Sequence, residues 1–93
     1  MITRVITNTV KEGHKDAYIE VSREFIKVLM ERDGCIEAHV YALEGSETKV
    51  VNIEKWPDRA TAEAVMQSET FGEFVPKLIQ HFVGNEEMYL EEK

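Results

Sequence analysis

Two spacings of hydrophobic residues alternate along the chain. Residues 2–10 are rich in Thr, Val and Ile, which favours a β-strand. From about residue 14 to residue 32 the apolar side chains recur at helical spacing, with charged residues between them: Tyr18, Val21, Phe25, Val28 and Leu29. The pattern therefore predicts a strand followed by an amphipathic helix, which Gly34 would end as a left-handed cap.

The alternating spacing of a strand returns after this helix. Residues 35–43 place Ile36, Ala38, Val40 and Ala42 on one face. Residues 44–47, with the sequence EGSE, are typical of a hairpin turn, and residues 48–56 alternate again. The middle of the chain is therefore predicted to form an antiparallel hairpin.

The second half of the chain begins with two helix-capping residues. Asp58 is a suitable N-cap for a short helix that reaches about Gln67, and Ser68 can cap a second helical segment. The apolar positions of that second segment are Phe71, Phe74, Val75, Leu78, Ile79 and Phe82. Pro76 should kink or restart this helix, and Gly84 should end it.

The order of these elements predicts the fold. Residues 88–90 indicate a short last strand, so the order is strand, helix, strand, strand, helix, strand. This order is typical of an α+β, ferredoxin-like βαββαβ fold, with an antiparallel sheet and its helices on one face. We expect one domain over residues 1–93. The other face of the sheet is then bare, so we also expect a homodimer that packs sheet against sheet.

Charge and composition narrow the classes of partner. The 93 residues carry a formal net charge of -7, which argues against binding to nucleic acid or to anionic membranes. Cys35 is the only cysteine, so no intrachain disulfide is expected. The N-terminal segment lacks the apolar run of a signal peptide, and no stretch approaches the roughly 20 apolar residues of a membrane span. These features favour a soluble cytoplasmic protein.

The predicted third strand contains VNIEKW, residues 51–56, whose two faces differ. One face carries Val51, Ile53 and Lys55, and the other carries an amide, a carboxylate and an indole in a row. If the hairpin is tight, with Gly45 and Ser46 at its centre, opposed residues share a face. The expected polar and aromatic face then consists of Glu37, His39, Tyr41, Asn52, Glu54 and Trp56, with Arg4 and Asn8 as candidates from the first strand.

Five residues of this face could each have either a chemical or a purely structural role. Trp56 could stack on a substrate ring, or could be a core residue. Asn52 could donate to a developing oxyanion, or could bond within the sheet. His39 could act as a general base, or could be an interface histidine. Glu37 and Glu54 could form a carboxylate pair with one raised pKa, or could pair with basic neighbours.

Short motifs along the chain resemble one family. They are Gly34-Cys35 before the second strand, Glu54-x-Trp56 at the end of the third, Ser68-x-x-Phe71-x-x-Phe74, and KEGH at residues 11–14. With these motifs the chain resembles the antibiotic biosynthesis monooxygenase (ABM) domain family, small dimeric α+β barrel proteins. The resemblance implies a homodimer with a pocket in each subunit between sheet and helices.

The resemblance also implies an activity. Some members oxidise polycyclic phenols or quinols with molecular oxygen and use no metal, flavin or haem, with an Asn and a Trp four residues apart in the pocket. Asn52 and Trp56 match that spacing, so we expect them, with His39, to be catalytic residues of a cofactor-independent monooxygenase that oxidises a small aromatic phenol or quinol. The expected substrate-binding residues are Asn8, Tyr41, Glu54, Phe71 and Phe74.

Alternative functions remain open at this point. Other relatives degrade haem, but Val65 and Val75 stand where the Trp and the iron-binding His would be placed. The three histidines lack the spacing of metal ligands, so no metal site is expected. A non-catalytic protein that binds a small ligand and an isomerase acting on a small carbonyl compound are the other candidates.

Overall fold

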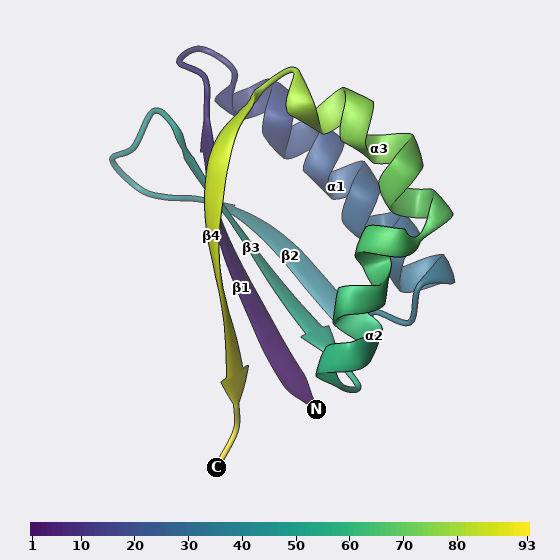
Figure 1. Ribbon diagram of the computed structural model, residues 1–93. Helices are drawn as coiled ribbons and strands as arrows, with labels where there is room; N and C mark the ends of the chain where they lie inside the picture. Colours follow the sequence, from purple (N-terminus) through teal and green to yellow (C-terminus); the bar gives the residue numbers. More distant parts are fainter.

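A computed structural model describes residues 1–93 and contains one sheet of four antiparallel strands, in the order β2-β3-β1-β4 (Figure 1). The strands are β1 Ile2–Val10, β2 Glu37–Ala42, β3 Lys49–Trp56 and β4 Phe82–Glu91. The helices are α1 Lys15–Arg32, α2 Arg59–Ala64 and α3 Glu69–Ile79, with a short 3₁₀ helix η1, Val65–Gln67, between the last two. The predicted order of elements and the α+β, ferredoxin-like class are confirmed.

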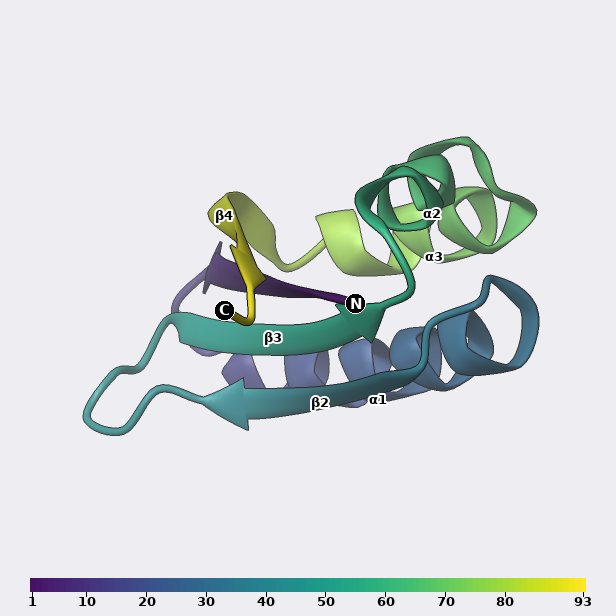
Figure 2. The ribbon, with the colours of Figure 1, turned by 90° about the horizontal axis from the view of Figure 1, so that it is seen from below.

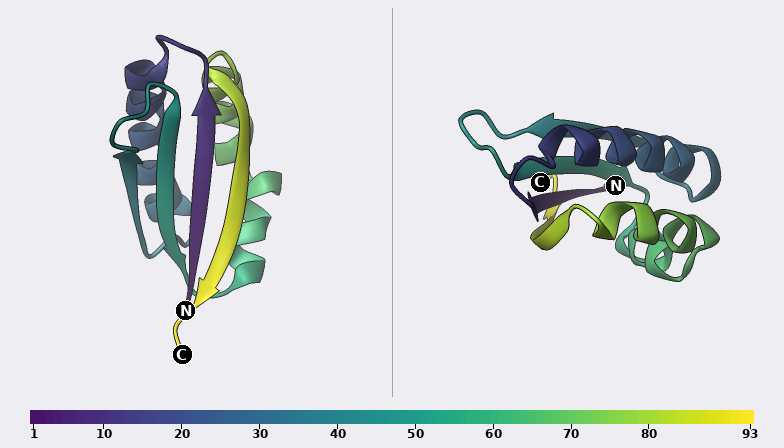
Figure 3. Two further views of the ribbon diagram at one scale, coloured as in Figure 1. Left: turned by 90° about the vertical axis from the view of Figure 1, so that its left-hand side faces the viewer. Right: turned by 90° about the horizontal axis from the view of Figure 1, so that it is seen from above.

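All helices lie on one side of the sheet. The views from below and from above show α1 and α3 side by side over the same face (Figures 2 and 3). The opposite face is uncovered, and in the left view of Figure 3 the strands can be followed across it from β2 to β4. None of the helices is both long enough and apolar enough to cross a membrane.

Local signals in the sequence set the helix boundaries. The Asp58 carboxylate accepts a hydrogen bond from the backbone N–H of Thr61 at 2.7 Å, and the Ser68 hydroxyl accepts one from Phe71 at 3.1 Å. Both residues are therefore N-caps, as predicted. Gly34 follows α1 with φ of +83°, and a Cβ there would lie 3.3 Å from the Thr61 side chain. Glycine suits this position in both conformation and space.

Two boundaries in the C-terminal third differ from the prediction. Helix α3 runs through Pro76 to Ile79 without restarting. Proline removes one backbone hydrogen bond from the helix, and the packing of α3 on α1 supports the helix across that position. Gly84 does not end this helix, since it already lies inside β4. That strand has 10 residues because it pairs with β1 along almost its whole length, from Glu91 opposite Ile2 to Phe82 opposite Val10.

The predicted register of the β2–β3 hairpin is wrong by one residue. Val40, not His39, lies opposite Asn52, and His39 lies opposite Ile53. The residues predicted to share one face therefore lie on opposite faces of the sheet, because a shift of one residue reverses the faces of a strand relative to its partner. Glu37, His39 and Tyr41 lie on the bare face, with Val51, Ile53 and Lys55 of β3.

The loop explains the shift. The Ser46 hydroxyl accepts hydrogen bonds from the backbone N–H groups of Thr48, at 3.2 Å, and Lys49, at 3.0 Å. The closing bond runs from Leu43 N to Lys49 O, so the loop is wider than the tight turn that the glycine suggested. A side-chain bond of this kind offers the backbone an alternative to a two-residue turn.

The polar face of β3 meets the helices. Asn52, Glu54 and Trp56 are buried there, and Arg4 and Asn8 of β1 lie on the same face, as expected for the first strand. The surrounding apolar core comprises Ile2, Ile26, Leu29, Cys35, Ala38, Trp56, Ala62 and Val65. Buried polar side chains interrupt this core, mainly along β1 and β3, and there the structure contains a cavity.

Candidate functional site

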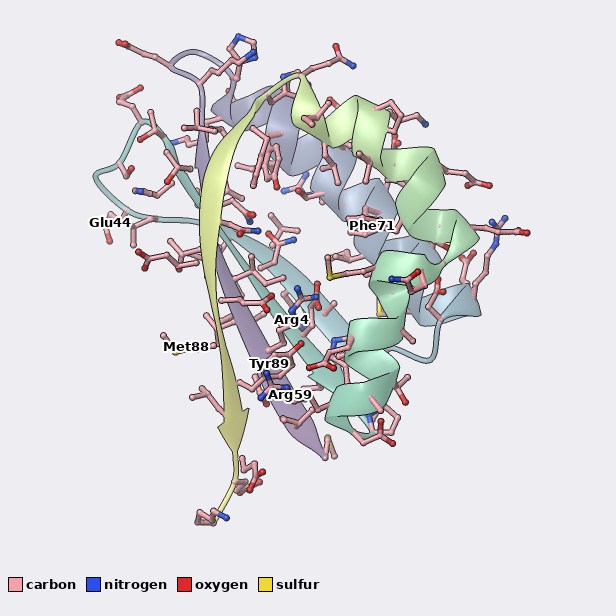
Figure 4. The ribbon with its side chains drawn as sticks, in the orientation of Figure 1. Arg4, Glu44, Arg59, Phe71, Met88 and Tyr89 are labelled. Atoms are coloured by element: carbon pink, nitrogen blue, oxygen red, sulfur yellow. The ribbon has the colours of Figure 1, made fainter.

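The cavity has a volume of about 240 Å³ and lies between the sheet and helices α1 and α3. Its walls are apolar and include Phe25 and Leu29 of α1 and Leu78 of α3. Phe71 points from α3 into the space between the layers (Figure 4). An engineered apolar cavity of about 150 Å³ holds benzene, so this cavity is large enough for a small aromatic molecule.

The floor of the cavity is polar and comes from the two central strands. Arg4 and Asn8 of β1 and Asn52 and Glu54 of β3 line it. A mainly apolar pocket with a few convergent polar groups is the usual form of a small-molecule site. The arrangement follows from the alternation of each strand, which turns these side chains toward the helices.

Hydrogen bonds fix the orientation of the two amides. The Asn8 nitrogen Nδ2 donates to the Val50 carbonyl at 3.2 Å and to Asn52 Oδ1 at 3.2 Å. A carbonyl accepts only, so the Val50 contact identifies the nitrogen of Asn8, and the atom of Asn52 that faces it must be oxygen. The amide nitrogen of Asn52 makes no hydrogen bond within the protein, and the residue lines the cavity, so this nitrogen is available to a bound molecule.

Glu54 is a buried carboxylate, with 1% of its surface exposed. Its Oε1 accepts a hydrogen bond from Trp56 Nε1 at 3.0 Å and lies 3.6 Å from Arg4 Nη1. Burial raises the pKa of Glu54, while the Trp56 hydrogen bond and the Arg4 charge oppose that rise and the Glu87 carboxylate adds to it. Both close contacts use Oε1, so Oε2 remains for a ligand.

Arg4 is shared between two carboxylates. Besides Glu54 it contacts Glu87 of β4, with Nε 3.0 Å from Oε2. Burial lowers the pKa of Arg4, but the Glu87 hydrogen bond and the charges of Glu54 and Glu87 outweigh this effect and raise it overall. Beside this group Arg59 lies over the Tyr89 ring, 4.2 Å from its centroid (Figure 4). Arg4 therefore remains a cation at the end of the cavity.

Helix α1 supplies two further polar groups to the cavity. The Ser22 hydroxyl is buried and has no hydrogen-bond partner. Burial raises the pKa of Tyr18 to about 12 and outweighs the lowering effect of the nearby Ser22 hydroxyl, so the phenol is neutral at physiological pH. Both residues line the cavity, so a ligand bound there would meet a buried hydroxyl on this side.

The structure brings together only part of the predicted site. Asn8, Asn52, Glu54 and Phe71 line the cavity. Trp56 is fully buried behind Glu54 and does not reach the cavity, so it contacts this site through the carboxylate. The position of Trp56 explains this. It is the last residue of β3 and packs in the core against Ala62 of α2 and Val65 of η1.

The remaining predicted residues lie elsewhere. Phe74 packs on Phe25, with ring centroids 5.2 Å apart, outside the cavity lining. His39 and Tyr41 are on the bare face of the sheet, where His39 Nε2 lies 2.9 Å from Glu37 Oε1. Glu37 therefore does not face Glu54, and the His39 hydrogen bond and the Lys55 charge lower its pKa.

Ser22 of α1 and Asn85 of β4 are polar cavity residues that the sequence pattern did not single out. Ser22 is buried on the same side of α1 as Tyr18 and Leu29. A small polar residue inside an apolar helical stripe is the signal that could have identified it. No cluster of three or more His, Cys, Asp and Glu side chains is placed to hold a metal ion.

Comparison with known proteins decides the family. The family model described as "Antibiotic biosynthesis monooxygenase" matches residues 1–77. The chain belongs to this family. None of the proteins with curated descriptions matches the chain.

Solved structures share the fold of this ABM domain over nearly its whole length. One described as an antibiotic biosynthesis monooxygenase is 20% identical, with a TM-score of 0.84 and coverage of 100% of this chain and 99% of that chain. SnoaB, a cofactor-independent oxygenase from Streptomyces nogalater, is 16% identical, with a TM-score of 0.84 and coverage of 99% and 92%. A conserved protein from Methanosarcina mazei Go1 is 22% identical, with a TM-score of 0.82 and coverage of 100% and 94%.

Proposed function

We propose that this ABM-family protein is a cofactor-independent monooxygenase that oxidises a small aromatic phenol or quinol with molecular oxygen. The observation that carries the proposal is the Asn52 amide, which lines an apolar, aromatic cavity while only its oxygen is used by Asn8, so that its N–H groups are available to a substrate. The family supports an oxygenase, and the solved structure of SnoaB shows this fold in a cofactor-independent oxygenase.

The chemistry requires a substrate that supplies its own electrons. Loss of the hydroxyl proton gives a phenolate whose negative charge is shared with a ring carbon. That carbon bonds to one oxygen atom of O2, and the resulting hydroperoxide loses water to leave a second carbonyl. A phenol and O2 therefore yield a quinone and water, with one oxygen atom in each product.

The cavity residues are suited to these reaction steps. The rings of Phe25 and Phe71 can hold a planar substrate, and the apolar walls exclude water from the reactive carbon. The Asn52 N–H groups can donate to the phenolate oxygen as charge develops on it. Asn8 holds the Asn52 amide in the required orientation through the 3.2 Å hydrogen bond.

The test is oxygen consumption with hydroxylated naphthalenes and anthracenes, with no cofactor added. We expect uptake above the rate without protein and incorporation of labelled O2 into a quinone. Removal of one such donor typically lowers kcat by about 10²–10³-fold, and we expect this loss for Asn52→Ala. Gln80→Ala, which changes an exposed amide on the surface, is the control and should retain activity. Equal rates for both variants would contradict the role of Asn52.

A second candidate is a non-catalytic protein that holds a small aromatic ligand in the same cavity. The observation in its favour is that no histidine lines the cavity, and histidine is the commonest general base. In that case the same compounds would raise the melting temperature without oxygen uptake.

We also propose that two copies pack through their bare sheet faces. Three large apolar side chains of this face, Tyr41, Met88 and Leu90, are each about half exposed at 48%, 56% and 48%. Figure 4 shows Met88 pointing away from the helices, and the apolar strip also includes Val51 and Ile53. Large exposed apolar patches commonly mark an interface between proteins.

A further inference from the structure

Among the groups that line the cavity, Glu54 is the only carboxylate. Its Oε1 is held by the Trp56 indole N–H at 3.0 Å and lies 3.6 Å from Arg4. Its Oε2 has no such contact. One oxygen is thus fixed by the protein, and the other is free to accept a proton from a bound molecule.

The strand places this oxygen beside the proposed hydroxyl site. Asn52 and Glu54 are two residues apart on β3 and line the cavity together. Alternate residues of a strand are separated by about 6.6 Å, and both side chains reach forward from the sheet. A hydroxyl oxygen between them can accept from the Asn52 amide while it donates to Glu54.

We propose that Glu54 removes the hydroxyl proton of the substrate and returns it later in the same turnover. This inference rests on the proposed oxygenase function and assigns the role of general base to Glu54. His39 cannot take this role because it lies on the bare face of the sheet.

The proton balance closes within the cavity. In the first step the O–H bond of the phenol breaks, Glu54 becomes a neutral acid and the substrate becomes a phenolate. After a ring carbon bonds to O2, the peroxide oxygen bears the negative charge and takes the proton back from Glu54. The O–O bond of the hydroperoxide then breaks, and water leaves with a hydrogen from the ring carbon. Glu54 is a carboxylate again, and O2 is the only oxidant.

The surroundings of Glu54 suit both halves of this cycle. Burial makes the carboxylate a stronger base than an exposed one, while Arg4 and the Trp56 N–H keep the charged form accessible. The other charged or titratable groups nearby are Glu87, Tyr89, Arg59, Cys35 and Tyr18. Burial raises the pKa of Cys35 to about 11 and that of Tyr18 to about 12, so both are neutral when Glu54 titrates.

The decisive experiment compares Glu54→Gln with the native protein on phenols of different acidity at neutral pH. Gln keeps the size of the side chain and an oxygen for Trp56 but accepts no proton. For weakly acidic phenols we expect kcat/KM to fall by about 10²–10⁴-fold, the usual contribution of a general base. For phenols already ionised in solution we expect rates close to native. Glu73→Gln, at an exposed carboxylate of α3, is the matched control and should behave as native.

The outcomes separate the two proposals. A loss in Glu54→Gln that is the same for every phenol would overturn proton transfer by Glu54 but keep the oxygenase. Absence of turnover by the native protein on all compounds would instead count against the oxygenase.

Binding of 4-nitrophenol then tests Glu54 without turnover, because the phenolate has its own absorption band. At mildly acidic pH we expect this band in the native complex and its loss in Glu54→Gln, with return at alkaline pH. An equally strong band in both proteins would contradict the inference.

Trp56 is a positioning residue in this scheme, and Trp56→Phe tests it through a pH profile. Loss of the indole N–H removes a group that lowers the pKa of Glu54, so the acidic limb of kcat/KM should move to higher pH. A uniform loss of activity with an unchanged profile would indicate a purely structural role for Trp56.

Discussion

The two faces of β3 reverse the usual distribution of side chains. Toward the helices the strand presents Asn52, Glu54 and Trp56, all at most 5% exposed. Toward the bare side it presents Val51, Ile53 and Lys55, of which the first two are half-buried and the lysine is exposed. The amide and the carboxylate are inside, while two β-branched hydrocarbons are at the surface of the single chain.

The difference shows that partners, not polarity alone, decide what this sheet buries. Asn52 is hydrogen-bonded to Asn8, and Glu54 to Trp56, so the inner groups do not lose all their polar contacts on burial. The outer hydrocarbons have no covering layer in the single chain. The inner face lines the cavity, and the outer face is the one that we propose a second copy covers.

The largest effect is expected from truncation on the inner face. Trp56 is fully buried in the main core cluster, so Trp56→Ala should lower the free energy of unfolding by about 3–5 kcal/mol. Tyr41→Ala removes an aromatic ring from the outer face, where 48% of the residue is exposed, and should cost far less in the monomer. Urea unfolding at a protein concentration that favours monomers measures both. Equal losses in the free energy of unfolding for the two variants would contradict the proposed difference in burial between the two faces.

A charge on the outer face should reveal whether that face is an interface. Ile53 lies at the centre of the bare side, between Val5 and His39 in neighbouring strands. Burial of an isoleucine side chain contributes about 1.5–3 kcal/mol, so Ile53→Glu should weaken association by at least about tenfold. Analytical ultracentrifugation checks this, with Lys77→Glu on α3 as a surface control. A native protein that is monomeric at all concentrations would contradict the dimer itself.

The smallest expected effect is on the pH dependence of folding stability, to which Glu54 on the inner face and Glu37 on the outer face contribute with opposite signs. Because the folded state raises the pKa of Glu54, its contribution to stability is greatest below the ordinary glutamate pKa and is lost as pH rises through the folded value. Because the folded state lowers the pKa of Glu37, its contribution is present above the ordinary value and is lost as pH falls. A shift of one pKa unit corresponds to about 1.4 kcal/mol for a buried group such as Glu54.

Two matched variants separate these signs. Relative to native protein, Glu54→Gln should gain stability as pH rises from acidic to neutral, and Glu37→Gln should gain as pH falls. Urea unfolding across that pH range gives both curves. If the stability of both variants, relative to native protein, changed in the same direction with pH, the proposed electrostatic difference between the two faces would be contradicted.

Short-range chemistry determined much of the structure in advance. The caps at Asp58 and Ser68 and the glycine after α1 act through neighbours in sequence, so a pattern of residue types identifies them. The alternation of side chains along a strand also correctly placed Asn52, Glu54 and Trp56 on one face of β3. These features depend only on backbone geometry and on hydrogen bonds that span a few residues.

Other features depended on contacts that no local pattern contains. The bonds of Ser46 widened the hairpin loop, which moved His39 and Tyr41 away from the cavity. The length of β4 was hidden because its polar residues are stabilised by pairing with β1, not by their own alternation.

The sequence by itself determined the order of the elements, the family and the membership of the polar triplet on β3. Only the tertiary structure decided that this triplet faces the helices, that Trp56 stands behind Glu54, and that Ser22 joins the cavity from α1. The reason is physical: alternation fixes which side chains share a face, whereas the face that becomes buried depends on how distant segments pack.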